Sequence, residues 1–286
     1  MSHVERGTFT KGVYAAASEI GASHIAQGMP CQDACKTGEG RGWFPYTIVA
    51  VADGHGDQRH DLSDIGAATA VEVAVRELSN SWHHYKLYRK SFHDFFCYDA
   101  GRRIVRAWRQ AITHCAETAG VTARPGRSVY ERYGTTVQVA MWANGYVLMA
   151  KVGDGEMRFS SDGISLQNPF VAPSDLDSQT THSLAMKDAS RVWQTAVYPE
   201  PAPGGYVFVS TDGLSNSFPT DQDYNAYVQQ LYNVVETHGL EAVSRSWPSW
   251  FSSYTHAGSG DDITAGMICF GLGEDERGKQ HDSART

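Results

Sequence analysis

The chain has 286 residues, of which 41% are hydrophobic and 20% charged, so it can bury one substantial core. Its 24 basic and 32 acidic residues give a net charge of −8, which argues against a nonspecific electrostatic grip on nucleic acid. No apolar run in the sequence approaches the ~20 residues that span a bilayer. We therefore expect neither nucleic acid nor a membrane as a partner.

A buried strand is predicted over residues 46–52, where an apolar run stops at the turn signal Asp53-Gly54. Apolar residues then recur at helical spacing. This spacing predicts a helix near residues 64–79 and a longer one near residues 99–119. The first half of the chain therefore carries a carboxylate at a strand end, followed by two helices.

The middle of the chain has the pattern of an antiparallel meander. Strands are predicted over residues 135–143 and 146–152, and Asn144-Gly145 between them supplies a tight hairpin turn. Asp154 follows between two glycines, which let backbone and ligand approach closely, and the chain then turns into a third short strand. A second aspartate thus lies at a strand end.

The last third repeats this pattern. Residues 206–210 resume the sheet and stop just before Asp212, and helices are predicted near residues 222–238 and 240–250. A closing strand is predicted over residues 263–270. Strands cluster with strands and helices follow in pairs, which predicts an α+β fold of antiparallel sheets flanked by helices.

Two segments differ from the rest of the chain. Residues 160–190 are rich in Ser, Asp and Thr and predict a long surface excursion that gates a site; with its return we take this flap-like segment as 160–205. Residues 273–286 contain no large apolar side chain and predict a disordered tail. The remaining expectation is a single domain over residues 1–272.

Four aspartates share one setting: Asp53, Asp154, Asp212 and Asp261 each lie in a glycine-flanked turn at a strand end. Carboxylates brought within a few Å of one another repel and raise each other's pKa, so such a cluster normally binds hard cations. Oxygen ligands favour Mg²⁺ or Mn²⁺ over Zn²⁺. Any single Asp-Gly is more often a structural turn, and the prediction depends on the joint arrangement.

Six short motifs follow one another along residues 12–271: Gln32-Asp33, Val51-Ala52-Asp53-Gly54-His55-Gly56, Tyr133-Gly134-Thr135-Thr136, Val152-Gly153-Asp154-Gly155, Ser210-Thr211-Asp212-Gly213-Leu214 and Gly260-Asp261-Asp262-Ile263-Thr264. In these motifs and their order the chain resembles the type 2C metal-dependent Ser/Thr protein phosphatases, as a bacterial-type member. The resemblance implies a four-layer α-β-β-α sandwich. It also implies hydrolysis of phosphoserine or phosphothreonine on protein by a metal-activated bridging water.

The resemblance implies two core cations, Mn²⁺ or Mg²⁺. Asp53 would bridge them, and the carbonyl of Gly54 would ligate one. Asp212 and Asp261 would complete the shell of the other, and Asp33 would act mainly through a metal-bound water. Paired divalent cations lower the pKa of a water and neutralise the oxygens of a phosphoryl transition state.

Two further roles are implied in the same way. Asp154, together with Asp212, would hold a third and weaker cation near the flap. His55 would protonate the leaving oxygen of the Ser or Thr side chain. An alkoxide leaves poorly without a proton, and histidine has a pKa close to the working pH.

The chain also departs from the family pattern. Gly28 stands where relatives often carry an arginine that clamps the substrate phosphate, and Gly155-Glu156 replaces a Ser-Arg pair. The phosphate would then rest on the metals or on another cation. The candidates that the sequence leaves open are Lys36, Arg6 and Arg158.

The expected partner is a phosphorylated protein, the product of a Ser/Thr kinase. Because the clamping arginine is missing, two alternatives stay open: a phosphatase for a small phosphorylated metabolite, and a phosphatase-like module that binds a partner without turnover. Five irregularly spaced cysteines do not form a disulfide framework, and the first residues lack the order of a signal peptide. Both features favour a cytoplasmic protein.

Overall fold

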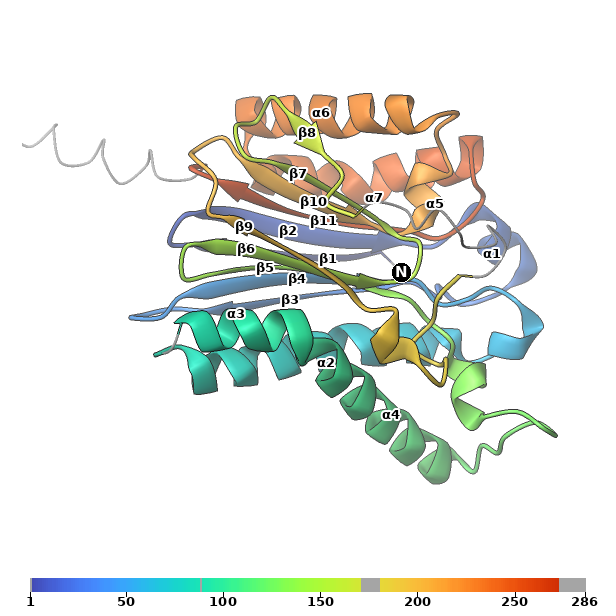
Figure 1. The fold of residues 1–286 in the computed structure, drawn as a ribbon. Coiled ribbons are helices and arrows are strands. Elements are labelled where there is room, and N and C mark those ends of the chain that lie inside the picture. Colours follow the sequence, from blue (N-terminus) through green and yellow to red (C-terminus); the bar gives the residue numbers. More distant parts are fainter. Residues whose placement is uncertain (1, 88, 171–180, 273–286) are drawn as a thin grey trace, which may run out of the picture.

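Two antiparallel sheets lie face to face in the computed structural model, and helices cover both outer faces (Figure 1). The structure describes residues 2–87, 89–170 and 181–272. The layers are therefore helix, sheet, sheet, helix, and the predicted α-β-β-α sandwich is confirmed. The predicted tail at 273–286 lies outside the described residues, and the single domain over 1–272 stays a prediction.

Within the described residues, one sheet has six strands and the other has five. The larger has the order β1 (His3–Phe9), β2 (Gly12–Glu19), β11 (Ile263–Phe270), β10 (Tyr206–Ser210), β7 (Glu156–Ser160) and β8 (Leu166–Gln167). The smaller has the order β3 (Ala34–Gly40), β4 (Tyr46–Ala52), β5 (Val137–Ala143), β6 (Tyr146–Val152) and β9 (Gln194–Pro199). The β5–β6 hairpin turns at Asn144 and Gly145 with φ of 55° and 81°, as an Asn-Gly turn of this kind requires.

The helices form two groups. The smaller sheet is covered by α2 (Ser63–Tyr85), α3 (Arg89–Tyr98) and α4 (Ala100–Ala119), and the larger by α6 (Asp221–His238) and α7 (Leu240–Ala257) (Figure 1). The short helices are α1 (Ala22–Gln27), α5 (Asp212–Ser215) and the 3₁₀ turns η1 (Gln58–His60), η2 (Val129–Tyr133) and η3 (Ala189–Arg191). No helix of the described residues is long and apolar enough to cross a membrane.

Strand β4 shows why the sequence pattern works. It is buried on both faces: Ile48 and Ala50 pack under the α2–α4 helices, and Val49 and Val51 pack between the sheets. A strand covered on both sides becomes a continuous apolar run instead of an alternating one. The same burial holds rigid the backbone that carries Asp53 immediately after β4.

Several elements escaped the sequence reading. Strands β1 and β2 and helix α1 fill the first 27 residues, and α3 lies between the two predicted helices. The segment 160–205 is only partly an excursion, because β8 and β9 lie within it. Strand β9 pairs with β6 at the sheet edge and is only half-buried, so its residues carry a weak hydrophobic pattern. Residues 171–180 of this segment lie outside the described residues.

Candidate active site

A cleft of about 570 Å³ opens where β4, β6 and β10 end and β11 begins. The antiparallel arrangement brings these strand ends to one edge of the sandwich, although they are far apart in the sequence. The carboxylates that line the cleft are Asp53, Asp57, Glu131, Asp154, Asp212 and Asp261. The cleft is therefore strongly acidic.

Asp53, Asp154 and Asp212 each offer a carboxylate oxygen, and these oxygens lie within 4.8 Å of one another. They come from the end of β4, the β6–β7 turn and the start of α5. Burial and the neighbouring Asp33 and Asp212 hold the pKa of Asp53 well above its ordinary value. Burial also raises the pKa of Asp212. Crowded carboxylates with raised pKa values fit a site for a hard divalent cation.

The predicted Asp33 lies next to this cluster. Its Oδ2 accepts a hydrogen bond from the hydroxyl of Thr211, at 2.8 Å. Burial and the nearby Asp262 hold the pKa of Asp33 well above its ordinary value. Asp33 does not line the cleft itself.

The Gly-Thr-Thr motif fixes the backbone of Asp53. The hydroxyl of Thr135 and the N–H of Thr136 both donate to the carbonyl of Asp53, each at 2.8 Å. The N–H of Asp53 donates in turn to the Thr136 hydroxyl at 3.1 Å. Both threonines are fully buried. The motif thus presents the Asp53 side chain to the cleft without occupying its carboxylate.

Asp261 lines the cleft, and its neighbour Asp262 is buried beneath it. Both Asp262 oxygens accept backbone N–H groups, from Gly21 at 2.6 Å and from Gln32 at 2.5 Å. These bonds attach the β2–α1 turn and the segment leading into β3 to the start of β11. Asp262 therefore positions the residues around the acidic cluster through hydrogen bonds to their backbone.

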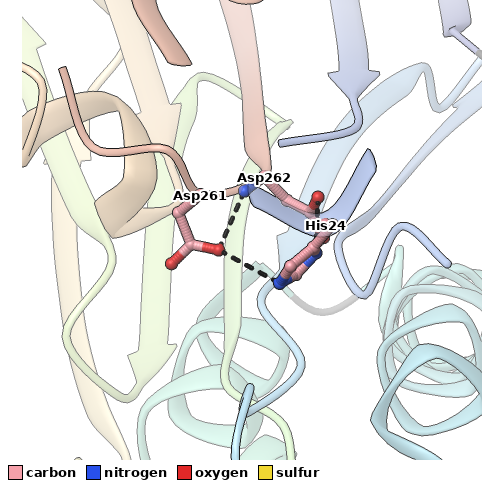
Figure 2. Close-up of side chains that lie close together, drawn as sticks. All are labelled: His24, Asp261 and Asp262. Carbon is pink, nitrogen blue, oxygen red and sulfur yellow. Dashed lines mark hydrogen bonds and ion pairs between the residues drawn. The ribbon is translucent and has the colours of Figure 1, made fainter. Parts of the chain in front are cut away.

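His24 joins the two aspartates (Figure 2). Its Nδ1 lies 2.9 Å from Oδ1 of Asp262, and its Nε2 lies 3.8 Å from Oδ1 of Asp261. The Nδ1 contact becomes an ion pair when His24 is protonated. Contact with Asp262 raises the pKa of His24. The sequence analysis did not identify His24, since this histidine lies in the unpredicted helix α1 and belongs to no motif.

His55 lies in the wall of the cleft beside a second histidine. The rings of His55 and His60 are 4.8 Å apart at 60°. Burial and the neighbouring His60 lower the pKa of His55 to about 4. Nδ1 of His60 donates to the carbonyl of Glu131. A side chain at Gly134 would collide with both rings, so glycine is required there.

The three proposed phosphate-binding cations do not line the cleft. Arg158 is buried, ion-paired with Asp221 and packed against an aromatic ring. Lys36 pairs with Glu72 at 2.9 Å on the helix-covered side of β3. Arg6 lines a separate cavity near the α6–α7 connection. In this structure none of the three candidate cations lies beside the aspartates of the cleft.

Among the described residues, Arg59 alone contributes an Arg or Lys side chain to the lining of the cleft. It lies in η1, directly after the Asp53 motif, and its Nε bonds to the Asp57 carboxylate at 3.0 and 3.1 Å. Gly28, the position of the missing family arginine, ends α1 with a positive φ of 67°. The sequence analysis did not identify Arg59, because the only signal for it in the sequence is its position shortly after the Asp53 motif.

The sequence model of the protein phosphatase 2C family matches residues 20–247, so the chain belongs to that family. The resemblance predicted from the motifs is confirmed. No curated protein sequence gives a significant match.

Solved structures share the fold. The serine/threonine phosphatase of S. agalactiae is 14% identical with a TM-score of 0.56, over 94% of this chain and 100% of that one. The catalytic domain of the phosphatase PstP, in complex with two manganese ions, is 16% identical with a TM-score of 0.54, over 93% and 98%. RsbX in complex with magnesium is 14% identical with a TM-score of 0.52, over 93% and 98%.

Proposed function

We propose that this protein is a metal-dependent phosphatase that hydrolyses phosphoserine and phosphothreonine in proteins. The observation that carries the proposal is the convergence of the Asp53, Asp154 and Asp212 oxygens within 4.8 Å. Family membership and the manganese- and magnesium-bound relatives support it. A cluster of this kind has little use in a protein that binds no cation, because the carboxylates repel one another.

Asp53, Asp154 and Asp212 would hold Mg²⁺ or Mn²⁺, with Asp261 and the Gly54 carbonyl as further ligands and Asp33 acting through water. Bound there, the cations would supply Lewis-acid activation of water and neutralise charge on the phosphate. Two core ions and a third, weaker one at Asp154 remain the expected number. Every donor in this set is an oxygen, which fits these cations better than Zn²⁺.

His55 would protonate the leaving oxygen. With a pKa of about 4, the His55 ring is the neutral imidazole near neutral pH, not the imidazolium. A phosphate dianion bound beside the ring favours the charged imidazolium and raises this pKa. His55 would thus become an acid when substrate is bound. The ring of His60 would support it from the adjacent position in the cleft wall.

Arg59 would contact the substrate phosphate in place of the missing family arginine. A guanidinium matches the oxygens of a phosphate as it matches those of a carboxylate. The carboxylate of Asp57 now occupies that fork. Arrival of a phosphate would exchange one oxyanion for another at the same guanidinium.

The test is hydrolysis of p-nitrophenyl phosphate and of a phosphothreonine peptide by the purified protein, with Mn²⁺, with Mg²⁺ and with EDTA. Metal-dependent turnover of both substrates is expected. A panel of sugar phosphates separates the small-metabolite alternative, because preference for these over the peptide would support it. Calorimetric metal binding without turnover of any substrate would contradict the proposal and favour the non-catalytic module.

A further inference from the structure

The outer face of α4 carries a row of cations. Arg102, Arg106 and Arg109 are spaced by four and three residues and therefore lie on one side of the helix. The opposite side, with Ile104 and Trp108, is completely buried in the core. In Figure 1, α4 lies in the helical layer outside the smaller sheet. Burial of the apolar side leaves the arginines on the surface.

These arginines form one wall of a groove of about 460 Å³. Tyr130 of η2 and Lys187, which precedes η3, form the other side. No Asp or Glu is found among the described residues that line the groove. This basic groove stands out in a chain whose net charge is −8.

The cations of the groove differ in their partners. Arg109 donates to the carbonyls of Met186 and Lys187, and its guanidinium lies 5.4 Å from the centre of the Tyr130 ring. It therefore holds the groove walls together. Arg102 is ion-paired with Asp99. Within the described part of the chain, Arg106 and Lys187 form no ion pair, so their charges are available to a ligand.

The basic groove adjoins the acidic cleft. Met186 lines the cleft, while its carbonyl is held by Arg109 from the groove side. On the other wall, Glu131 lines the cleft and the preceding Tyr130 lines the groove. Two short segments, one at Met186 and Lys187 and one at Tyr130 and Glu131, thus separate the groove from the cleft.

We infer that the basic groove binds an acidic flanking segment of the phosphoprotein substrate, a role that rests on the phosphatase function proposed above. Among the described residues that line the cleft, carboxylates outnumber the single Arg59 side chain, so the protein itself offers acidic residues little positive charge there. The groove beside it offers unpaired cations and a guanidinium fork, which matches Glu and Asp side chains. A polypeptide can place its phosphoresidue in the cleft and its acidic residues in the groove.

Binding is measured directly, without turnover. The probe is a fluorescein-labelled, unphosphorylated peptide with a run of glutamates, and a peptide with glutamines is its control. We expect the glutamate peptide to bind more tightly and to weaken as salt is raised. The double variant Arg106→Glu/Lys187→Glu should raise its Kd by about tenfold or more. An unchanged Kd would overturn the inference.

A second double variant, Lys11→Glu/Arg245→Glu, makes the same charge change at exposed positions away from the groove. It should leave the Kd of the glutamate peptide within about twofold of the original. An equal loss in both variants would show that only overall charge matters, which contradicts a defined site. A labelled single-stranded RNA that binds more tightly than the peptide, with the same loss in the groove variant, would overturn the acidic-peptide assignment.

Turnover gives an independent readout. In the groove variant, kcat/KM for a phosphothreonine peptide that carries the glutamate run should fall by about tenfold, with p-nitrophenyl phosphate turnover unchanged. If the unaltered protein hydrolyses neither substrate, the proposed phosphatase function fails, yet the anisotropy measurement still decides whether the groove binds acidic peptide. The two failures are therefore distinguishable.

Discussion

Two acidic clusters share one edge of the sandwich, and their carboxylates are satisfied in different ways. Asp262 is buried, accepts two backbone N–H groups and faces His24. Asp53, also surrounded by protein, accepts no hydrogen bond from an N–H or a hydroxyl among the described residues, and its neighbours are further carboxylates. The Asp262 carboxylate is thus bound by protein donors on both oxygens, whereas the Asp53 carboxylate has no such donor among the described residues.

Burial alone therefore does not define the role of a carboxylate. The neighbouring groups decide whether a buried carboxylate accepts hydrogen bonds from the backbone or is suited to bind a cation. Replacing an aspartate by asparagine should therefore have opposite effects on metal-free stability in the two clusters. Experiments of this kind can contradict the comparison.

The largest effect is expected for Asp53→Asn. Loss of this central ligand should lower metal-dependent turnover by about 10³-fold or more, and metal affinity measured by calorimetry should fall with it. In EDTA, the same change should raise the melting temperature, because it removes one charge from a repelling cluster. Asp57→Asn is the matched control: that carboxylate pairs with Arg59, and metal binding should persist. Equal metal affinity in both variants would contradict the assignment.

Asp262→Asn should instead lower the stability of the metal-free protein. The amide keeps one oxygen but places an NH₂ against a backbone N–H, so the free energy of unfolding should fall by about 2–3 kcal/mol. Urea unfolding in EDTA measures this. Its control is the neighbouring, more exposed Asp261→Asn, which should change stability by less than about 1 kcal/mol. A smaller loss in Asp262→Asn than in its control would remove the distinction between the clusters.

His55→Ala should reduce turnover of a phosphothreonine peptide by about 10²-fold. Turnover of p-nitrophenyl phosphate should fall much less, because p-nitrophenolate leaves without a proton. The ratio of the two kcat values is the measurement. Equal losses for both substrates would argue against a leaving-group acid at this position.

Three buried carboxylates should make the metal-free protein less stable as pH rises. Asp33, Asp53 and Asp212 have pKa values raised above their ordinary 3.8, so the folded state binds more protons than the unfolded state. Their favourable contribution is fully present below pH 3.8 and is lost as pH rises through the raised values. Melting temperature in EDTA should therefore fall more steeply with pH than in Mn²⁺, and Asp53→Asn should reduce the slope. A slope that is independent of metal would contradict this.

Arg59→Ala should have the smallest effect, raising KM for the phosphothreonine peptide by about fivefold to tenfold. Arg59→Lys should recover little, because an ammonium lacks the planar fork. Arg41→Ala, another exposed arginine paired with a near neighbour, is the control and should leave KM unchanged. A change in kcat alone would place Arg59 outside the phosphate contact.

The sequence predicted best those elements whose burial or turn geometry restricts the residue types that they contain. The apolar run of β4 and the Asn144-Gly145 turn predicted their elements, because burial on both faces and a tight turn leave a direct trace in composition. The half-buried edge strand β9 left no such trace. The aspartates at strand ends could be named, since each has its own glycine turn.

Contacts between distant segments were beyond the sequence. His24 meets Asp262 only after β2 and β11 pair in the larger sheet. Arg158, one of the open candidates for phosphate binding, is ion-paired instead with Asp221, 63 residues further along the chain. The charge of an arginine is visible in a sequence, but its partner is not.

The bond between Gly21 and Asp262 joins positions 241 residues apart, and β11 lies between β2 and β10 in the sheet. During synthesis at ~5–20 residues per second, β2 leaves the ribosome some tens of seconds before its partner strand is made. Throughout that interval the nascent chain carries Asp33 and Asp53 but cannot yet assemble the centre. Under the proposed function, metal loading would therefore be a late event in the life of each molecule, and a prematurely terminated chain would lack part of the site.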